Sequence, residues 1–117
     1  MKRGEIWTIA GGPDYSGKPR PAVIVQDDRF DAMGSVTICA FTSQPIDAPL
    51  VRIPVRPDDR NVLRSPSRLM VDKLTTIPVS KLGDRIGVLG PQDMVSLDRA
   101  LLVFLGLAGP PPAAAEG

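Results

Sequence analysis

The sequence predicts a mainly β domain with one C-terminal helix, folded as a small twisted β-barrel or half-barrel against which the helix packs. Two observations predict this fold class. Short β-favouring segments alternate with glycine- and proline-rich turns through the first two-thirds of the chain, and a helical spacing of apolar residues is found only near the end. The 117 residues fit one domain, which we assign to residues 1–108, and the proline- and alanine-rich tail at residues 109–117 is expected to be disordered.

The first three strands are expected at residues 4–10, 22–26 and 36–42. Residues 4–10 (GEIWTIA) alternate apolar with polar side chains, and Trp7 in this strand is expected in the core. Residues 22–26 (AVIVQ) are almost continuously apolar, which favours a central strand. Residues 36–42 (VTICAFT) alternate again, and Cys39 is expected to behave as a small buried hydrophobic residue.

Three further strands are expected in the middle of the chain. Residues 50–55 have prolines within and around them, which restricts this strand to a sheet edge because proline cannot donate a backbone hydrogen bond. Residues 68–74 (RLMVDKL) and 85–89 (RIGVL) follow as the fifth and sixth strands. Small barrels with one open face often bind extended polymers, although fold alone does not assign a function.

The C-terminal helix is expected to begin at Pro91, because proline is favoured at the first helical position. Asp93 then places a negative charge near the positive end of the helix dipole, and Gly106 or Gly109 is expected to end the helix. The apolar residues of its core-facing side recur at three- and four-residue spacing, and they are Met94, Leu97, Leu101, Phe104 and Leu105.

The net charge of +1 conceals an uneven distribution of charge. Residues 52–73 predict a local basic surface, for which a solvated loop face is the alternative interpretation. The basic residues of this segment are Arg52, Arg56, Arg60, Arg64, Arg68 and Lys73, against Asp58, Asp59 and Asp72. No stretch approaches the roughly 20 apolar residues of a membrane helix. No secretion signal follows Lys2 and Arg3, so a cytoplasmic protein without a membrane partner is expected.

The absence of histidine and the single cysteine restrict the chemistry of the protein. They exclude an internal disulfide, the usual zinc sites and every catalytic pair that needs histidine. Any catalysis must use arginine, lysine, carboxylate, hydroxyl or backbone groups. Asp27, Asp28 and Asp31 offer oxygens of the kind that Mg²⁺ or Ca²⁺ binds, but neither glutamate nor EF-hand spacing accompanies them, so a hydrated loop is the preferred interpretation.

Arg20 is the most informative candidate for a functional residue. It lies between Pro19 and Pro21, directly before an apolar strand, and the two rings restrict where its guanidinium can point. A positioned arginine suits a phosphate, because its planar fork donates to two oxygens at once. The alternative is an exposed arginine in a loop that proline stiffens for stability alone, and the residues by themselves favour that alternative.

Several segments, taken in order, resemble the MazF/PemK family, the endoribonuclease toxins of bacterial toxin–antitoxin pairs. The resemblance runs from about residue 2 to residue 107, and the ordered set is more specific than any single motif. The segments are RGEIW (3–7), the glycine-rich loop that follows, GKPRPAVIVQ (17–26), FTSQ (41–44), VDKLTTI (71–77) and the helix ALLVFLGL (100–107).

The resemblance implies an SH3-like β-barrel, a homodimer, a cognate antitoxin and cleavage of single-stranded RNA, usually mRNA, without a metal or other cofactor. It implies that Arg20 and Thr42 are catalytic. The further candidates for catalysis or RNA binding are Ser43, Asp72, Lys73, Lys18, Tyr15 and Arg68. Some relatives have a histidine in the first loop and an arginine where Met70 stands here, so the assignment of Asp72 depends on fewer matching residues.

The implied chemistry is feasible without histidine, because RNA carries its own nucleophile in the 2′-OH. Arg20 would neutralise the charge that develops on phosphorus, and the hydroxyl of Thr42 or Ser43 would donate to a phosphate oxygen. Asp72 or a group of the substrate would act as base. The basic residues of the middle segment would contact RNA, or an acidic part of the antitoxin.

Two other functions remain open from the sequence. A toxin of the same fold can bind and poison DNA gyrase without being an enzyme, and such a protein needs only a binding surface and terminal helix residues. The other is a binding module that retains the groove but has lost the activity. The presence of both Arg20 and Thr42 at the expected positions favours the nuclease.

Overall fold

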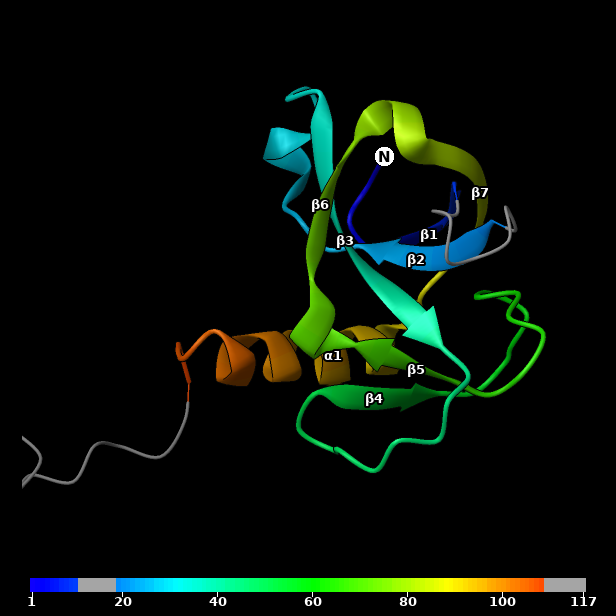
Figure 1. Ribbon diagram of the computed structural model, residues 1–117, viewed down its shortest axis with the longest axis vertical. Coiled ribbons are helices and arrows are strands. Elements are labelled where there is room, and N and C mark those ends of the chain that lie inside the picture. The colour runs from blue at the N-terminus through cyan, green and yellow to red at the C-terminus, as the bar shows by residue number, and fades with distance from the viewer. Residues whose placement is uncertain (11–18, 109–117) are drawn as a thin grey trace, which may run out of the picture.

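The fold is an antiparallel sheet of seven strands with one helix packed on one side of it (Figure 1). The structure is a computed structural model that describes residues 1–10 and 19–108. The strands are β1 (Glu5–Ile9), β2 (Arg20–Ile24), β3 (Ser35–Thr42), β4 (Arg52–Val55), β5 (Ser67–Met70), β6 (Thr75–Pro78) and β7 (Leu82–Val88). The helix is α1 (Pro91–Phe104), and the 3₁₀ turns are η2 (Asp28–Phe30), η3 (Val71–Lys73) and η4 (Val79–Lys81).

The strand order is β4-β5-β3-β2-β1-β7, and β6 adds to β3 beside this path. Strand β3 is the centre of the sheet, because it pairs with β2 along one edge and with β6 and then β5 along the other. Within the described part of the chain, β4 and β7 are the end strands of this path, so the barrel-like sheet is not closed. The predicted fold class, mainly β with a C-terminal helix, is confirmed.

Two apolar clusters lie on opposite sides of the central strands. The larger one joins the sheet to α1 and consists of Ile6, Val23, Cys39, Phe41, Ile53, Val55, Leu69, Val71, Leu89, Leu97 and Ala100. The smaller one, on the other face, consists of Ala22, Ile24, Val36 and Ile38, and Trp7 packs against its margin. Strand β2 is therefore buried on both faces, which explains its continuous apolar sequence and confirms its predicted central position.

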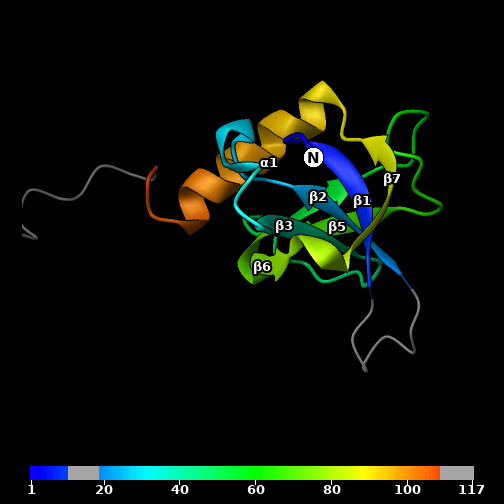
Figure 2. The same ribbon diagram turned by 90° about the horizontal axis from the view of Figure 1, so that it is seen from above.

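The helix begins at Pro91, as predicted, with Gly90 as its N-cap, and Gly106 follows its end with φ +75°. The prediction that the last apolar residues of the helix face the core is wrong. Phe104 and Leu105 are 44% and 56% exposed, because this end of α1 runs beyond the sheet (Figures 1 and 2). No helix in the described ranges is long and apolar enough to span a membrane.

The prediction of a strand at residues 68–74 is wrong for residues 71–74. Strand β5 ends at Met70, and the chain then turns through η3, where buried Val71 packs in the larger cluster and its backbone N–H donates to the carbonyl of Val51 at 2.9 Å. The chain can then pair β6, which the sequence did not predict, with the first half of β3. The tail at residues 109–117 lies outside the described residues.

The remaining predicted strands exist, with shifted ends. The strand predicted at residues 22–26 is β2, which begins two residues earlier at Arg20, and the one predicted at 85–89 is β7, which begins at Leu82. The strand predicted at residues 50–55 is β4, which lies at a sheet edge as its prolines require.

Candidate active site

Arg20 and Thr42 lie at the same end of the paired strands β2 and β3, each two residues beyond the last pair that joins them. The register sets Ala22 against Ala40 and Val23 against Cys39. Continued by two residues, the same register sets Arg20 against Thr42. Residues that face each other across antiparallel strands point to the same side of the sheet, with the strands about 4.8 Å apart. The strand pairing therefore brings two residues that are far apart in the sequence to the same end and the same face of the sheet.

The same row continues over the neighbouring strands. Ile9 of β1 pairs with Arg20, Thr42 pairs with Arg68 of β5, and Arg68 pairs with Pro54 of β4. We call Ile9, Arg20, Thr42, Arg68 and Pro54 the cross-strand row. Their sequence neighbours Phe41, Leu69 and Ile53 belong to the cluster beneath α1, so the row lies on the face that α1 does not cover.

The hydroxyl of Thr42 has a defined orientation. Its Oγ1 accepts a hydrogen bond from the backbone N–H of Gln44 at 3.2 Å, and Arg68 Nη1 donates to the carbonyl of Gln44 at 3.4 Å. Because Oγ1 is the acceptor in this bond, the hydroxyl hydrogen is available to donate to a substrate oxygen. Ser43 is exposed directly after the strand.

Gln44 was not predicted as a site residue. Its contribution comes from its backbone N–H, which donates to the hydroxyl of Thr42 two residues before it and so closes a turn. The spacing Thr-x-Gln is too common in sequences to predict such a turn by itself.

Arg20 is exposed and is the first residue of β2. Its place in a paired strand means that the sheet, as well as the two flanking prolines, fixes its backbone. Tyr15 and Lys18, which were also candidates, lie outside the described residues. Lys73 is exposed at the end of η3, where its carbonyl accepts a hydrogen bond from Thr75 Oγ1 at 3.1 Å.

Asp72 is held by a buried arginine. Arg52 Nε donates to Oδ1 of Asp72 at 2.8 Å and Nη2 donates to Oδ2 at 3.1 Å, and the side chains of Arg52 and Asp72 are 7% and 31% exposed. The hydrogen bonds from Arg52 and its positive charge lower the pKa of Asp72, so this carboxyl is ionised at neutral pH. Both carboxylate oxygens are engaged in the fold.

The basic surface predicted over residues 52–73 needs one correction. Arg52 does not belong to it, because its side chain is buried and its charge is balanced by Asp72. Arg56, Arg60 and Arg64 are exposed, and Arg68 is half-buried in the cross-strand row. The positive charge of the segment therefore lies on the loop between β4 and β5 and at the start of β5.

Cys39 and the loop aspartates have structural roles. Burial, and then the negative charge of Asp72, raise the pKa of the Cys39 thiol to about 12. Asp28 accepts a hydrogen bond from the backbone of Arg3 at 2.7 Å, and Asp27 caps η2. No group of three or more potential metal ligands is found in residues 1–10 and 19–108.

The sequence and fold were compared with those of known proteins. Residues 2–105 match the family model described as the PemK-like, MazF-like toxin of type II toxin–antitoxin systems. The chain belongs to this family. The match covers all seven strands and α1, and it confirms the resemblance on which Arg20 and Thr42 were assigned.

Individual relatives agree with this membership. A probable endoribonuclease MazF from Mycolicibacterium smegmatis (strain ATCC 700084 / mc(2)155) is 55% identical over 109 residues, which cover 93% of this chain and 100% of that protein. The Mycobacterium tuberculosis toxin MazF-mt6 superposes with a TM-score of 0.70 at 25% identity, over 88% of this chain and 99% of its own. An endoribonuclease in complex with its cognate antitoxin, from a mycobacterial species, shares the fold with a TM-score of 0.77 at 23% identity, over 94% and 99% of the two chains.

Proposed function

We propose that this family member is an endoribonuclease that cleaves single-stranded RNA, chiefly mRNA, with some sequence preference, and so inhibits translation and growth. The observation that supports the proposal is the pairing of β2 with β3, which puts Arg20 and Thr42 at the same end of the two strands, on the uncovered face. The name of the 55% identical relative, a probable endoribonuclease, supports it.

The reaction is a transesterification at phosphorus. The 2′-oxygen of the substrate forms a bond to phosphorus while the bond to the 5′-oxygen breaks, which gives a 2′,3′-cyclic phosphate and a 5′-hydroxyl. The proton of the 2′-OH passes to the base, which is water or a group of the substrate, and the leaving 5′-oxygen takes a proton from water. Arg20 neutralises the charge that develops on the phosphorane oxygens, and Thr42 donates its hydroxyl hydrogen to one of them.

Asp72 is assigned a structural role in this proposal, because both of its oxygens accept hydrogen bonds from Arg52. The base is then water or a group of the substrate. We further propose that the reaction needs no metal ion, because the 2′-OH provides the nucleophile and Arg20 provides the positive charge.

The partners proposed are a cognate antitoxin and a second copy of the chain. The C-terminal part of α1 and the residues after it expose an apolar surface of the kind that partner proteins cover. Its residues, all at least 42% exposed, are Leu102, Val103, Phe104, Leu105 and Leu107. The mycobacterial structure with its antitoxin supports such a partner. We place the protein in the cytoplasm, where mRNA is translated.

Poisoning of DNA gyrase is not favoured as the function. That activity needs no arginine and hydroxyl aligned on one face, and the most similar protein described above is named a probable endoribonuclease. The nuclease and the gyrase poison differ in one direct observation, which is whether purified protein cleaves RNA in the absence of any other protein.

The test is to incubate the purified chain with single-stranded RNA in excess EDTA and to map the ends. We expect cleavage that leaves 5′-hydroxyl ends, and a loss of about 100-fold or more in kcat/KM for Arg20→Ala. Arg29→Ala is the matched control, because Arg29 is an exposed arginine of η2 that pairs with Asp27. Cleavage by Arg20→Ala at the wild-type rate, or complete inhibition by EDTA, would contradict the proposal. Intact RNA together with trapped gyrase–DNA complexes would support the alternative.

A further inference from the structure

Arg68 lies opposite Thr42 where the pairing of β3 with β5 ends. The two pairs of this ladder are Phe41 with Leu69 and Thr42 with Arg68. Beyond Thr42 the chain leaves the sheet, and residues 43–47 are exposed and belong to no helix or strand. The hydroxyl that the proposed reaction uses therefore lies at the point where the sheet stops fixing the backbone.

The segment after Thr42 is held by three hydrogen bonds that converge on Gln44. The backbone N–H of Gln44 donates to Thr42 Oγ1 at 3.2 Å. Its carbonyl accepts from the backbone N–H of Ile46 at 2.9 Å and from Arg68 Nη1 at 3.4 Å. A carbonyl oxygen has two lone pairs, so it can accept both bonds. Of these three bonds, only the one from Arg68 joins the segment to another strand.

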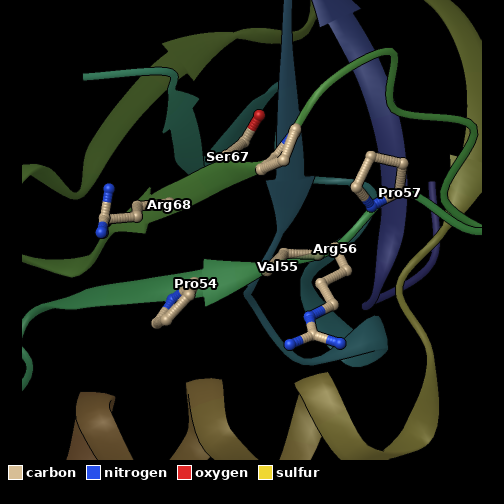
Figure 3. Close-up of a pocket in the computed structure, with 7 residues that line it drawn as sticks. Pro54, Val55, Arg56, Pro57, Ser67 and Arg68 are labelled. Carbon is tan, nitrogen blue, oxygen red and sulfur yellow. The ribbon is translucent and has the colours of Figure 1, made fainter. Parts of the chain in front are cut away.

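The surroundings of Arg68 favour this bond. Arg68 lines a pocket of about 570 Å³ at the start of β5, together with Pro54 and Pro66 (Figure 3). The described lining of the pocket includes no carboxylate, and Arg68 forms no ion pair within residues 1–10 and 19–108. Figure 3 shows the guanidinium groups of Arg68 and Arg56 pointing in different directions. Among the described residues, no carboxylate therefore competes with the carbonyl of Gln44 for Arg68.

The position of Gln44 determines which way the hydroxyl of Thr42 donates. While Oγ1 accepts the N–H of Gln44, its own hydrogen points elsewhere and is available for a substrate oxygen. An N–H that donates to the hydroxyl oxygen also polarises the hydroxyl, which strengthens its donation. If the backbone of Gln44 turned away, Oγ1 would lose this donor and the hydroxyl hydrogen would be able to bond to a nearby backbone carbonyl instead.

We propose that Arg68 is a positioning residue for the cleavage reaction. It holds the carbonyl of Gln44 in place, and so keeps the N–H of Gln44 on the hydroxyl oxygen of Thr42. The inference rests on the proposed function. Arg68 acts through Thr42 and adds nothing to RNA binding, which separates it from the exposed arginines of the loop between β4 and β5. Its loss should slow the chemical step and leave substrate affinity unchanged.

A double-mutant cycle tests whether Arg68 acts through Thr42. Arg68→Met removes the guanidinium and keeps an unbranched side chain. We expect this substitution to lower the single-turnover cleavage rate about fivefold, which corresponds to the loss of one hydrogen bond. In a protein that already carries Thr42→Val and has no hydroxyl to orient, Arg68→Met should lower the rate by less than about twofold.

Two further variants separate positioning from loss of charge. Arg68→Lys keeps a donor that can reach a carbonyl, and it should retain at least about half of the wild-type rate. Arg29→Met is the matched control, because it removes an exposed arginine of η2 that pairs with Asp27, and its rate should equal that of wild type. Binding of a 2′-O-methyl RNA, which cannot be cleaved, should have the same Kd and salt dependence for wild type and Arg68→Met.

The alternatives give different results. An equal effect of Arg68→Met in the wild-type and Thr42→Val proteins would overturn the inference. Weaker binding of the 2′-O-methyl RNA by Arg68→Met, with a smaller salt dependence, would make Arg68 an RNA contact and would also overturn it. Either result leaves the nuclease proposal standing, because wild type still cleaves. If wild type cleaves no RNA, the nuclease proposal fails and the positioning role fails with it.

Amide hydrogen exchange in the protein without RNA gives a measurement that does not depend on cleavage. Arg68→Met should speed exchange at the amide of Gln44, because the segment loses its bond to β5. The amides within β3 are the reference, since a general loss of stability would speed their exchange as well. Unchanged exchange at Gln44 would show that Arg68 does not hold this segment, and the inference would be wrong.

Discussion

The guanidinium of Arg52 donates two parallel hydrogen bonds to the carboxylate of Asp72, and this ion pair joins β4 to the turn that follows β5. The two residues are 20 positions apart in the sequence. The pair uses a carboxylate that the family resemblance marked for RNA binding and an arginine that the charge pattern marked for a basic surface. We therefore first predict how this pair affects the stability of the fold and how that stability depends on pH.

Replacing Asp72 by alanine should destabilise the fold. The substitution leaves the buried Arg52 without its carboxylate, and we expect the free energy of unfolding to fall by about 2 to 3 kcal/mol. Urea denaturation at pH 7 measures it. The control is Asp27→Ala, which removes an exposed pair with Arg29 and should have a much smaller effect. An equal loss in both variants would show that the Arg52–Asp72 pair adds nothing specific.

The same pair should make stability depend on pH at the acidic end. Hydrogen bonds from Arg52 lower the pKa of Asp72 in the folded protein, so its contribution is present above the unfolded value, about pH 4, and is lost as the pH falls through the folded value. Wild type and Asp72→Asn should therefore differ most near pH 7 and converge as the pH falls below the lowered pKa of Asp72. Unfolding curves at a series of pH values measure the difference, and a constant gap would contradict this cause.

Thr42→Val should remove a hydrogen-bond donor without changing the shape of the side chain. We expect kcat to fall about 100-fold with RNA binding nearly unchanged, because the donor acts on charge that develops during the reaction. Thr42→Ser keeps the hydroxyl and should retain most of the activity. Single-turnover cleavage measures both variants. Equal activity of Thr42→Val and Thr42→Ser would assign Thr42 to packing alone.

Asn61→Ala should loosen the loop between β4 and β5. The fully buried amide satisfies three backbone groups, and its removal should cost about 3 kcal/mol of unfolding free energy. Amide hydrogen exchange should show faster exchange at Asp58 and Leu63. Asp59→Ala, an exposed substitution in the same loop, serves as the control. Unchanged exchange at both amides would mean that the loop is held by its contacts with β7.

Cys39 should not react in the folded protein. Burial raises the pKa of its thiol to about 12, so almost no thiolate is present near neutral pH and the sulfur is shielded from reagents. A coloured disulfide reagent at pH 8 should label the protein only after denaturant is added. Rapid labelling of the native protein would show that β3 opens readily, because Cys39 is fully buried and is paired with Val23 of β2.

Much of the fold could be predicted from residue patterns. Alternation and β-propensity located β1, β3 and the edge strand β4, and Pro91 located the start of α1. The strand predictions failed where a contact with a distant segment, and not the local residue pattern, determines the backbone conformation. Residues 68–74 favour a strand throughout, yet the burial of Val71 beneath α1 turns the chain after Met70.

The sequence by itself determined the chemistry that is possible, because the absence of histidine leaves arginine, carboxylates and hydroxyls, and its order of motifs indicated the family. Only the tertiary structure decided which of these groups meet. The register of β2 with β3 puts Arg20 and Thr42 at the same end of the two strands, and the pairing of Arg52 with Asp72 engages both oxygens of that carboxylate. The physical reason is that strand register and side-chain pairing depend on contacts between distant segments, which no local spacing of residues encodes.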